Sequence, residues 1–341
     1  MLFRYELRKV ALLPAIIGFA ALCLIVNVLI IAAYERPLSD DAQTRELTDV
    51  FEGLRASSIA DSYVSKHDLS GAREANVRAK YEKLQPVIDA KAARDDALSV
   101  YLGPDSYSVH GQLFGRVLPA VIAEGCLIAL FLALLCSGYE HIHNTEAIVY
   151  TSKPGRNIIR TKFLAALTGG LGLFCLILVV TLSIFFARFD FSPAWNENVS
   201  SGFNFAVGLF GKPFITWESC TVLQYLWASV GAAAGLVVCF CLLGYAVGTF
   251  IRNVYLSCLA AILLCGAMLI ARPLLQIGGI PRGIINLTPL WLWANSGEWF
   301  TDGGADILWA RFEGIGIATS LILLAAATVV AAARFKRRNL D

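Results

Sequence analysis

Two histidines and two glutamates lie close together in one polar segment, and these residue types could ligate a metal ion. Glu140, His141, His143 and Glu146 all fall between positions 140 and 146. A zinc site needs three or four converging ligands, but the two histidines are two residues apart and point in different directions on a helix. We therefore favour a polar helix end over a metal site.

Glu124 is the most isolated acid in the sequence, because a long apolar stretch surrounds it. It lies about eleven residues, or roughly 16 Å, into a predicted helix. An acid at membrane depth marks a transport path or forms a hydrogen bond to a neighbouring helix. Glu124 is thus a candidate for a translocation path or for an interhelical contact with Ser or Thr. An enzyme would require Glu124 to gather with His110 or other polar groups, since no nucleophile, base and orienting group are evident.

Nucleotide-binding motifs are absent from the sequence. The phosphate-binding loop GxxxxGK[ST] does not occur, and the nearest stretch, GLFGKP, has Pro213 where Ser or Thr would hold magnesium. The sequence also lacks the HExxH, GxSxG and kinase signatures. We therefore predict no catalytic residue, no cofactor and no metal in this chain.

The composition is that of a membrane protein. Of 341 residues, 57% are hydrophobic and 16% are charged, against about 45–50% apolar and about 25% charged residues in soluble domains. The net charge of +2 gives no reason to expect a nucleic-acid partner. The cysteines lie mostly in apolar runs without a CxxC pair, so we interpret them as buried apolar residues.

Six stretches approach or exceed the roughly 20 apolar residues that a membrane-spanning helix needs. They are Leu12–Tyr34, Leu113–Gly138, Phe163–Phe186, Val222–Phe250, Val254–Ala271 and Phe312–Ala333. The first is longer than the apolar core of a signal peptide, so we expect a retained anchor. The fourth carries Gly231–Gly235 and Gly244–Gly248, small-residue faces that favour close helix crossing within one subunit or between two. The fold class is therefore an all-α membrane protein with six transmembrane helices.

Orientation follows from the positions of Lys and Arg near the span ends, which concentrate on the cytoplasmic side. With a cytoplasmic N-terminus, the short inner segments carry Arg4, Arg8, Lys9, Lys153, Arg156, Arg160, Lys162, Arg252, Arg334, Lys336, Arg337 and Arg338. The short outer segments carry Arg188, Lys212, Arg272, Arg282 and Arg311. Both termini are then cytoplasmic, as are the loop 139–162 and the basic tail 334–341. We expect the cell membrane, and specifically a bacterial inner membrane.

The chain divides into a first span within residues 1–34, an extracytoplasmic insert at 35–112 and a five-span bundle at 113–341. Two apolar stripes predict a helical hairpin in the insert, broken at the HDLSG stretch. The stripes are Leu47, Val50, Phe51 and Leu54, and then Val77, Tyr81, Leu84 and Ile88. The outer loops 187–221 and 272–311 are rich in tryptophan, which is typical of membrane-interface anchoring. Ile284–Trp293 is too short to span and predicts one re-entrant or interfacial helix.

The polar loop between the second and third spans carries a recognisable pattern. Glu140 follows the second span, a short amphipathic stretch covers Thr145–Thr151, and Pro154 and Arg156 precede Lys162 at the next span. This pattern, together with the order of spans, resembles the type-2 ABC-transporter permease family, exporter type. The resemblance covers the whole chain in outline, and it implies a cytoplasmic coupling helix in this loop.

The resemblance implies a permease subunit that exports a hydrophobic or amphipathic compound. A separate ATP-binding-cassette ATPase would bind ATP, and a second permease subunit would complete a homo- or heterodimer in the lipid bilayer. The residues implied to couple to the ATPase are Glu140, Glu146, Tyr150, Lys153, Pro154 and Arg156. The alternative is a membrane sensor or scaffold subunit whose outer hairpin binds a ligand or partner without net transport.

Overall fold

The regular secondary structure of the described residues is helical. The computed structural model describes residues 2–34, 49–96, 109–151, 155–192, 194–204, 214–251 and 253–337. Within these ranges there is no β-strand, and two isolated bridges, Asn198 to Thr221 and Thr216 to Thr301, join loop segments. The prediction of an all-α chain is therefore confirmed for these residues.

Among the described residues, six helices are long and apolar enough to cross a membrane. They are α2 (Pro14–Ala32), the helix Val109–Ile142 that contains η2 (Leu113–Val117) and α6 (Leu118–Ile142), α8 (Ile158–Arg188), α11 (Val222–Phe250), α12 (Val254–Ala271) and α15 (Phe312–Arg337). A helix of this kind corresponds to each of the six predicted spans. Three begin or end several residues beyond the predicted limits, because polar residues extend the helices past their apolar cores. This is the architecture of a multi-pass membrane protein.

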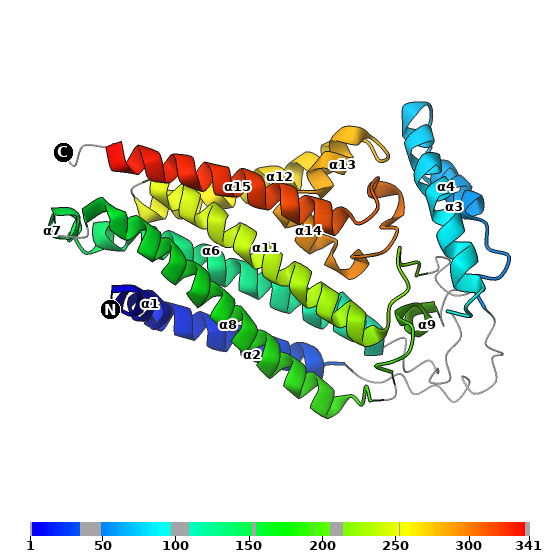
Figure 1. The fold of residues 1–341 in the computed structure, drawn as a ribbon, viewed down its shortest axis with the longest axis horizontal. Helices are drawn as coiled ribbons and strands as arrows, with labels where there is room; N and C mark the ends of the chain where they lie inside the picture. The colour runs from blue at the N-terminus through cyan, green and yellow to red at the C-terminus, as the bar shows by residue number, and fades with distance from the viewer. Residues whose placement is uncertain are drawn as a thin grey trace.

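The helices run side by side and give the molecule two distinct ends (Figure 1). The start of α1 (Leu2–Ala11), the short α7 (Glu146–Thr151) and the end of α15 lie at one end, which we call the termini end. The helices α3 (Ala56–Lys66) and α4 (Ala72–Ala92) lie at the other, the cap end. The described residues of the loop 139–162 and of the insert thus lie at opposite ends of the bundle.

Helices α6 and α11 form the centre of the bundle, where α6 packs on α8 and α11 packs on α15. The second glycine pair explains the closeness of α11 to α6. A Cβ placed on Gly244 would stand 2.6 Å from the backbone oxygen of Leu130, and one on Gly248 would stand 2.0 Å from Ser137 Oγ. This face therefore packs within the subunit. On the first pair, Gly235 faces Ile317 of α15, while Gly231 faces open space.

Helices α3 and α4 pack on each other as a hairpin, and we call residues 49–96 the cap. The predicted second stripe is confirmed, since Val77, Tyr81, Leu84 and Ile88 are all fully buried in the cap core. The helix predicted from the first stripe is wrong over 50–54: these residues form turns, with Gly53 at φ +70°, and the first cap helix begins later, at Ala56. Leu47 lies outside the described residues.

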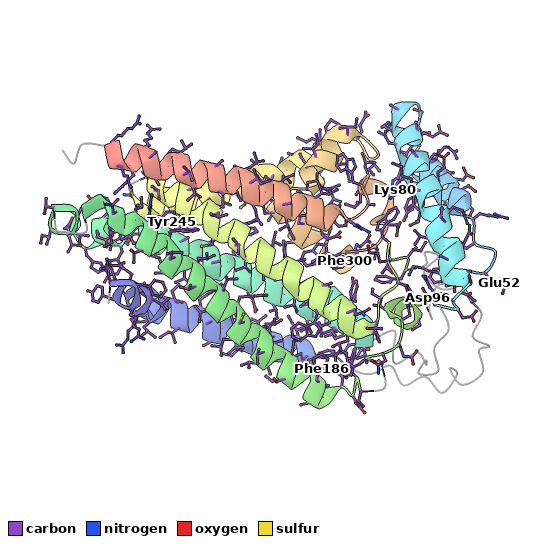
Figure 2. The ribbon with its side chains drawn as sticks, in the orientation of Figure 1. Glu52, Lys80, Asp96, Phe186, Tyr245 and Phe300 are labelled. Carbon is purple, nitrogen blue, oxygen red and sulfur yellow. The ribbon has the colours of Figure 1, made fainter. Side chains whose placement is uncertain are left out.

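The cap is attached to the bundle by buried polar contacts. Lys80 donates hydrogen bonds to the backbone oxygens of Asp302, Gly304 and Ile307, and Tyr81 donates to Asp302 Oδ2 at 2.7 Å. Lys91 donates to Thr216 Oγ1 at 2.9 Å. Figure 2 shows Lys80 and Phe300 at the cap end, with Tyr245 toward the other end. The hairpin is thus docked on the loops that precede α11 and α15.

Burial shapes the ionisation of these docking residues. Burial and the neighbouring Asp302 raise the pKa of Tyr81. Burial lowers the pKa of Lys91, and the carboxylate of Asp96, 3.7 Å from its Nζ, opposes that shift. A lysine that loses its hydration needs such partners to stay charged. The contacts with Asp96 and Thr216 therefore hold Lys91 in an apolar cap core.

The loop before α15 is a folded layer of short helices rather than a single interfacial helix. It contains η4 (Arg272–Leu274), α13 (Ile280–Asn286), α14 (Pro289–Ala294), η5 (Ser296–Glu298) and η6 (Gly304–Asp306). The predicted helix Ile284–Trp293 is wrong, because the chain breaks at Leu287 and restarts with Pro289 in the first turn of α14. Trp299 is fully buried and donates to the Leu292 oxygen, so it packs in the protein instead of anchoring at the interface.

Candidate functional site

A buried cluster of charges lies at the termini end, where three helices meet. Glu6 and Lys9 come from α1, Glu140 from the end of α6 and Lys162 from the start of α8. Lys9 Nζ is 2.6 Å from Glu140 Oε1 and 3.4 Å from Glu6 Oε2. Lys162 donates to Glu140 Oε2. We call these four residues the Glu140 cluster.

The local sequence explains how these charges reach one another. Glu6 and Lys9 are three residues apart, so they lie on the same face of α1. Helix α1 packs mainly on α8 and also touches α6, which turns that face toward Glu140. Lys9 Nζ also lies 3.9 Å from the centre of the Tyr139 ring. The contacts between α1 and the two spans therefore bury the charges together.

The Glu140 cluster is balanced in charge and shielded from solvent. It holds two acids and two bases, and Glu6, Glu140 and Lys162 are each at most 2% exposed. Taking charges out of water is costly unless each is paired, and removal of one partner from a buried pair typically costs about 3–5 kcal/mol. Glu140 is bonded by two cations from different helices, so its carboxylate fixes α1, α6 and α8 to one another.

Helix α7 follows directly from this cluster. Helix α6 ends at Ile142, Asn144 adopts a left-handed φ of +54°, and α7 begins at Glu146. The short helix predicted at Thr145–Thr151 is present, and its Ile148 side chain is 73% exposed. Gly155 has a φ of +51°, a backbone conformation that glycine adopts readily. An apolar side chain is thus presented to the surroundings beside the buried charges.

The other residues implied to couple to an ATPase are placed only in part. Glu146 Oε1 lies 3.5 Å from His141 Nδ1 at the helix junction. Lys153 and Pro154 lie outside the described residues, and the side chains of Tyr150 and Arg156 are outside the described part of the structure. The structure therefore brings Glu140 and Lys162 together and sets Glu146 beside His141. In the described ranges, no group of three His, Cys, Asp or Glu residues converges as a metal site would require.

Glu124 makes an interhelical contact deep in the bundle. Asn27 of α2 donates to Glu124 Oε2 at 2.8 Å and to Thr181 Oγ1 of α8 at 3.1 Å. Asn27 is 1% and Glu124 9% exposed, so the three polar groups form a buried link between α2, α6 and α8. His110 instead packs on Phe191, with ring centroids 5.1 Å apart. This geometry agrees with the predicted hydrogen-bonded contact, though with an asparagine as the donor.

Sequence reasoning missed Glu6, Lys9 and Asn27. The sequence places Arg4, Arg8 and Lys9 together as orienting cations, but Lys9 turns inward while Arg4 and Arg8 are exposed. The sequence signal for Glu6 and Lys9 is their spacing of three residues in a short amphipathic segment, which places an acid and a base on one helix face. For Asn27, the signal was a polar amide in the middle of the first span, where an unpaired amide would be costly.

In comparisons with known proteins, no family model, no curated protein and no solved structure matches this chain. The functional conclusion therefore depends on the site itself and on the resemblance of the loop.

Proposed function

We propose that this chain is the membrane permease subunit of an ATP-driven ABC transporter of the exporter type, energised by a separate ATPase subunit. The observation that carries the proposal is the Glu140 cluster at the root of α7. It joins the segment that would receive force to three helices of the bundle. The loop pattern of Glu140, Pro154, Arg156 and Lys162 supports the same assignment.

The geometry supports a role for α7 as a lever that moves the joined ends of α1, α6 and α8. An ATPase pressing on α7 would act through the short connection at residues 143–145 on the end of α6. Because Glu140 is tied to α1 and α8, the three helix ends would move as one body rather than bend separately. Rigid-body rocking between two packed arrangements is a known way to convert a local contact into a change of access. The ATP-binding residues belong to the partner, since this sequence has no phosphate-binding loop.

The exposed side chain of Ile148 supports a partner surface at α7. At 73% exposure it is among the most solvent-accessible large apolar side chains of the described residues. An ATPase groove would cover it, as an amphipathic helix is covered when it docks in an apolar groove. Under this proposal the termini end is cytoplasmic, the cap is extracytoplasmic, and the membrane is the bacterial inner membrane. A second permease subunit would complete the transport path.

The proposed cargo is a hydrophobic or amphipathic compound. A groove of about 360 Å³ runs between α11, α12, α14 and α15, and its walls include Phe240, Met268 and Leu323. Apolar walls with few polar groups favour an apolar guest. The groove is consistent with this cargo class and does not distinguish a drug, a lipid or a peptide.

The proposal is tested by purifying the chain in mild detergent from the membranes that naturally hold it and measuring ATP hydrolysis. We expect a soluble polypeptide with a GxxxxGK[ST] motif to co-purify, and Ile148→Asp to release it by placing a charge in the interface. Leu274→Asp, at a 77% exposed apolar position of the cap end, is the matched control and should retain the ATPase. Retention of coupled hydrolysis by the Ile148 variant would contradict the coupling role, and a preparation without any ATPase would favour the sensor alternative.

A further inference from the structure

A cavity of about 500 Å³ lies at the cap end, between the first turns of α11 and α15. Its walls include the aromatic rings of Trp217, Tyr225 and Phe300. Trp217 also packs against the core of the cap, and its backbone N–H donates to the Phe300 oxygen at 2.9 Å. The cavity therefore lies where the cap, the loop before α11 and the loop before α15 meet.

Glu313 lines this cavity, and its side chain is only 2% exposed. It receives hydrogen bonds from the backbone of Phe300 and from its own backbone. Its Oε2 atom is buried and has no partner among the described residues. A buried acceptor without a partner is costly and calls for an explanation such as a bound group. A ligand that donates to Oε2 would supply the partner.

The charged residues that line the cavity leave the negative charge of Glu313 unbalanced. The lining contains two acids, Glu218 and Glu313, and one base, Arg311. Arg311 is bonded to Glu218 at the rim, where both side chains are about two-thirds exposed. The rim pair is neutral, so the net charge of the lining is that of the Glu313 carboxylate. A cationic ligand fits this balance, whereas an anion would meet an uncompensated acid.

Two residues of the cavity lining have strained backbone conformations. Phe300 has a φ of +63° and Arg311 a φ of +54°, both in the left-handed region that residues other than glycine rarely adopt. Phe300 carries an aromatic wall and Arg311 the rim cation. Strain of this kind persists where the surrounding structure over-determines it, and such residues cluster at ligand sites.

We propose that this cavity binds an organic cation, a protonated amine with an apolar body. The ammonium group donates to Glu313 Oε2, and the apolar body lies against Trp217, Tyr225 and Phe300. Aromatic faces attract cations and also cover apolar surface, so both parts of the ligand are matched. A metal cation fits poorly, because hard cations need six or more oxygen ligands and the lining is mainly aromatic. The inference stands whether or not the chain is a transporter.

The test uses the purified full chain and a fluorescent amine, dansylcadaverine, with its N-acetylated neutral form as the matched ligand. We expect saturable binding of the amine and at least tenfold weaker binding of the acetylated form. Glu313→Gln should weaken amine binding at least tenfold, which corresponds to about 1.4 kcal/mol. Glu197→Gln, an acid outside the lining, is the control and should bind as the natural chain does.

A second variant keeps the test decisive if Glu313→Gln fails to fold. Ala228 lines the cavity from α11 and is exposed, so Ala228→Phe should fill the cavity without disturbing the core. We expect it to remove amine binding while the thermal unfolding midpoint stays unchanged. Equal affinity for the charged and acetylated probes would overturn the proposal. Binding of the amine by Glu313→Gln and Ala228→Phe as tight as by the natural chain would also overturn it, as would the lack of saturable binding at millimolar amine.

Discussion

The pairing of Glu140 with Lys162 predicts strong energetic coupling between the two side chains. Glu140→Gln leaves Lys9 and Lys162 buried with one acid, and Lys162→Met leaves two acids with one base. Each change leaves an uncompensated buried charge, so each should lower the free energy of unfolding by about 3–5 kcal/mol. If the two sites were independent, the double variant would lose the sum, roughly 6–10 kcal/mol.

The double variant should lose much less than that sum. With Glu140 and Lys162 both neutral, Glu6 and Lys9 still pair at 3.4 Å, and the cluster is again balanced in charge. We therefore expect an interaction energy of about 2–3 kcal/mol, near the top of the usual range for residues in contact. An interaction energy of this size would show that the Glu140–Lys162 bond holds α6 to α8 next to the start of α7.

The assay is reversible unfolding in mixed micelles with increasing SDS, followed by tryptophan fluorescence, for the natural chain, both single variants and the double variant. Arg8→Ala is the control, because Arg8 is exposed beside the cluster and should change stability by less than about 0.5 kcal/mol. Additivity of the two single changes within about 0.5 kcal/mol would refute the reasoning, since it would mean that Glu140 and Lys162 do not interact with each other.

Further predictions concern the cap and the packing of the spans. Lys80→Met should undock the cap at a cost of about 1–3 kcal/mol, because three buried carbonyls lose their donor. Proteolysis of the cap should then be faster than in Lys83→Met, a control at an exposed lysine of the same helix. Equal rates of proteolysis in the two variants would contradict this prediction. Gly244→Ala should destabilise the bundle by about 1–3 kcal/mol, since its Cβ would meet backbone 2.6 Å away. Gly266 faces open space, so Gly266→Ala should leave the thermal unfolding midpoint unchanged while Gly244→Ala lowers it. Equal midpoints for these two variants would contradict the close packing of Gly244 against α6.

The spans could be predicted from sequence because their signal is local. A run of about 20 apolar residues has few other stable arrangements, and the helix Val222–Phe250 has the limits that its apolar run predicts. The buried stripe of α4 was predictable for the same reason, since a helical period repeats over several turns. Predictions of this kind require no knowledge of distant partners.

The site depended on contacts that local patterns do not contain. Lys9 and Glu140 are 131 positions apart, so no local pattern shows that these two residues pair with each other. The helix predicted from the stripe Leu47–Leu54 is wrong over 50–54 because Gly53 takes a positive φ there, and the apolar residues pack on the cap from turns. The tryptophan-rich loop 272–311 predicts anchoring at the membrane interface, whereas the loop folds around Trp299 and buries it.

The central claim is that α7 contacts an ATPase, and photo-crosslinking tests it most directly. A photoreactive amino acid would replace Ile148 in α7, and the same amino acid at Leu274, 77% exposed at the cap end, would be the control. After irradiation of native membranes, we predict that the position in α7 captures a polypeptide that carries GxxxxGK[ST] and hydrolyses ATP, and that the control position does not. Capture of lipid alone at position 148, or of the same polypeptides at both positions, would contradict the account.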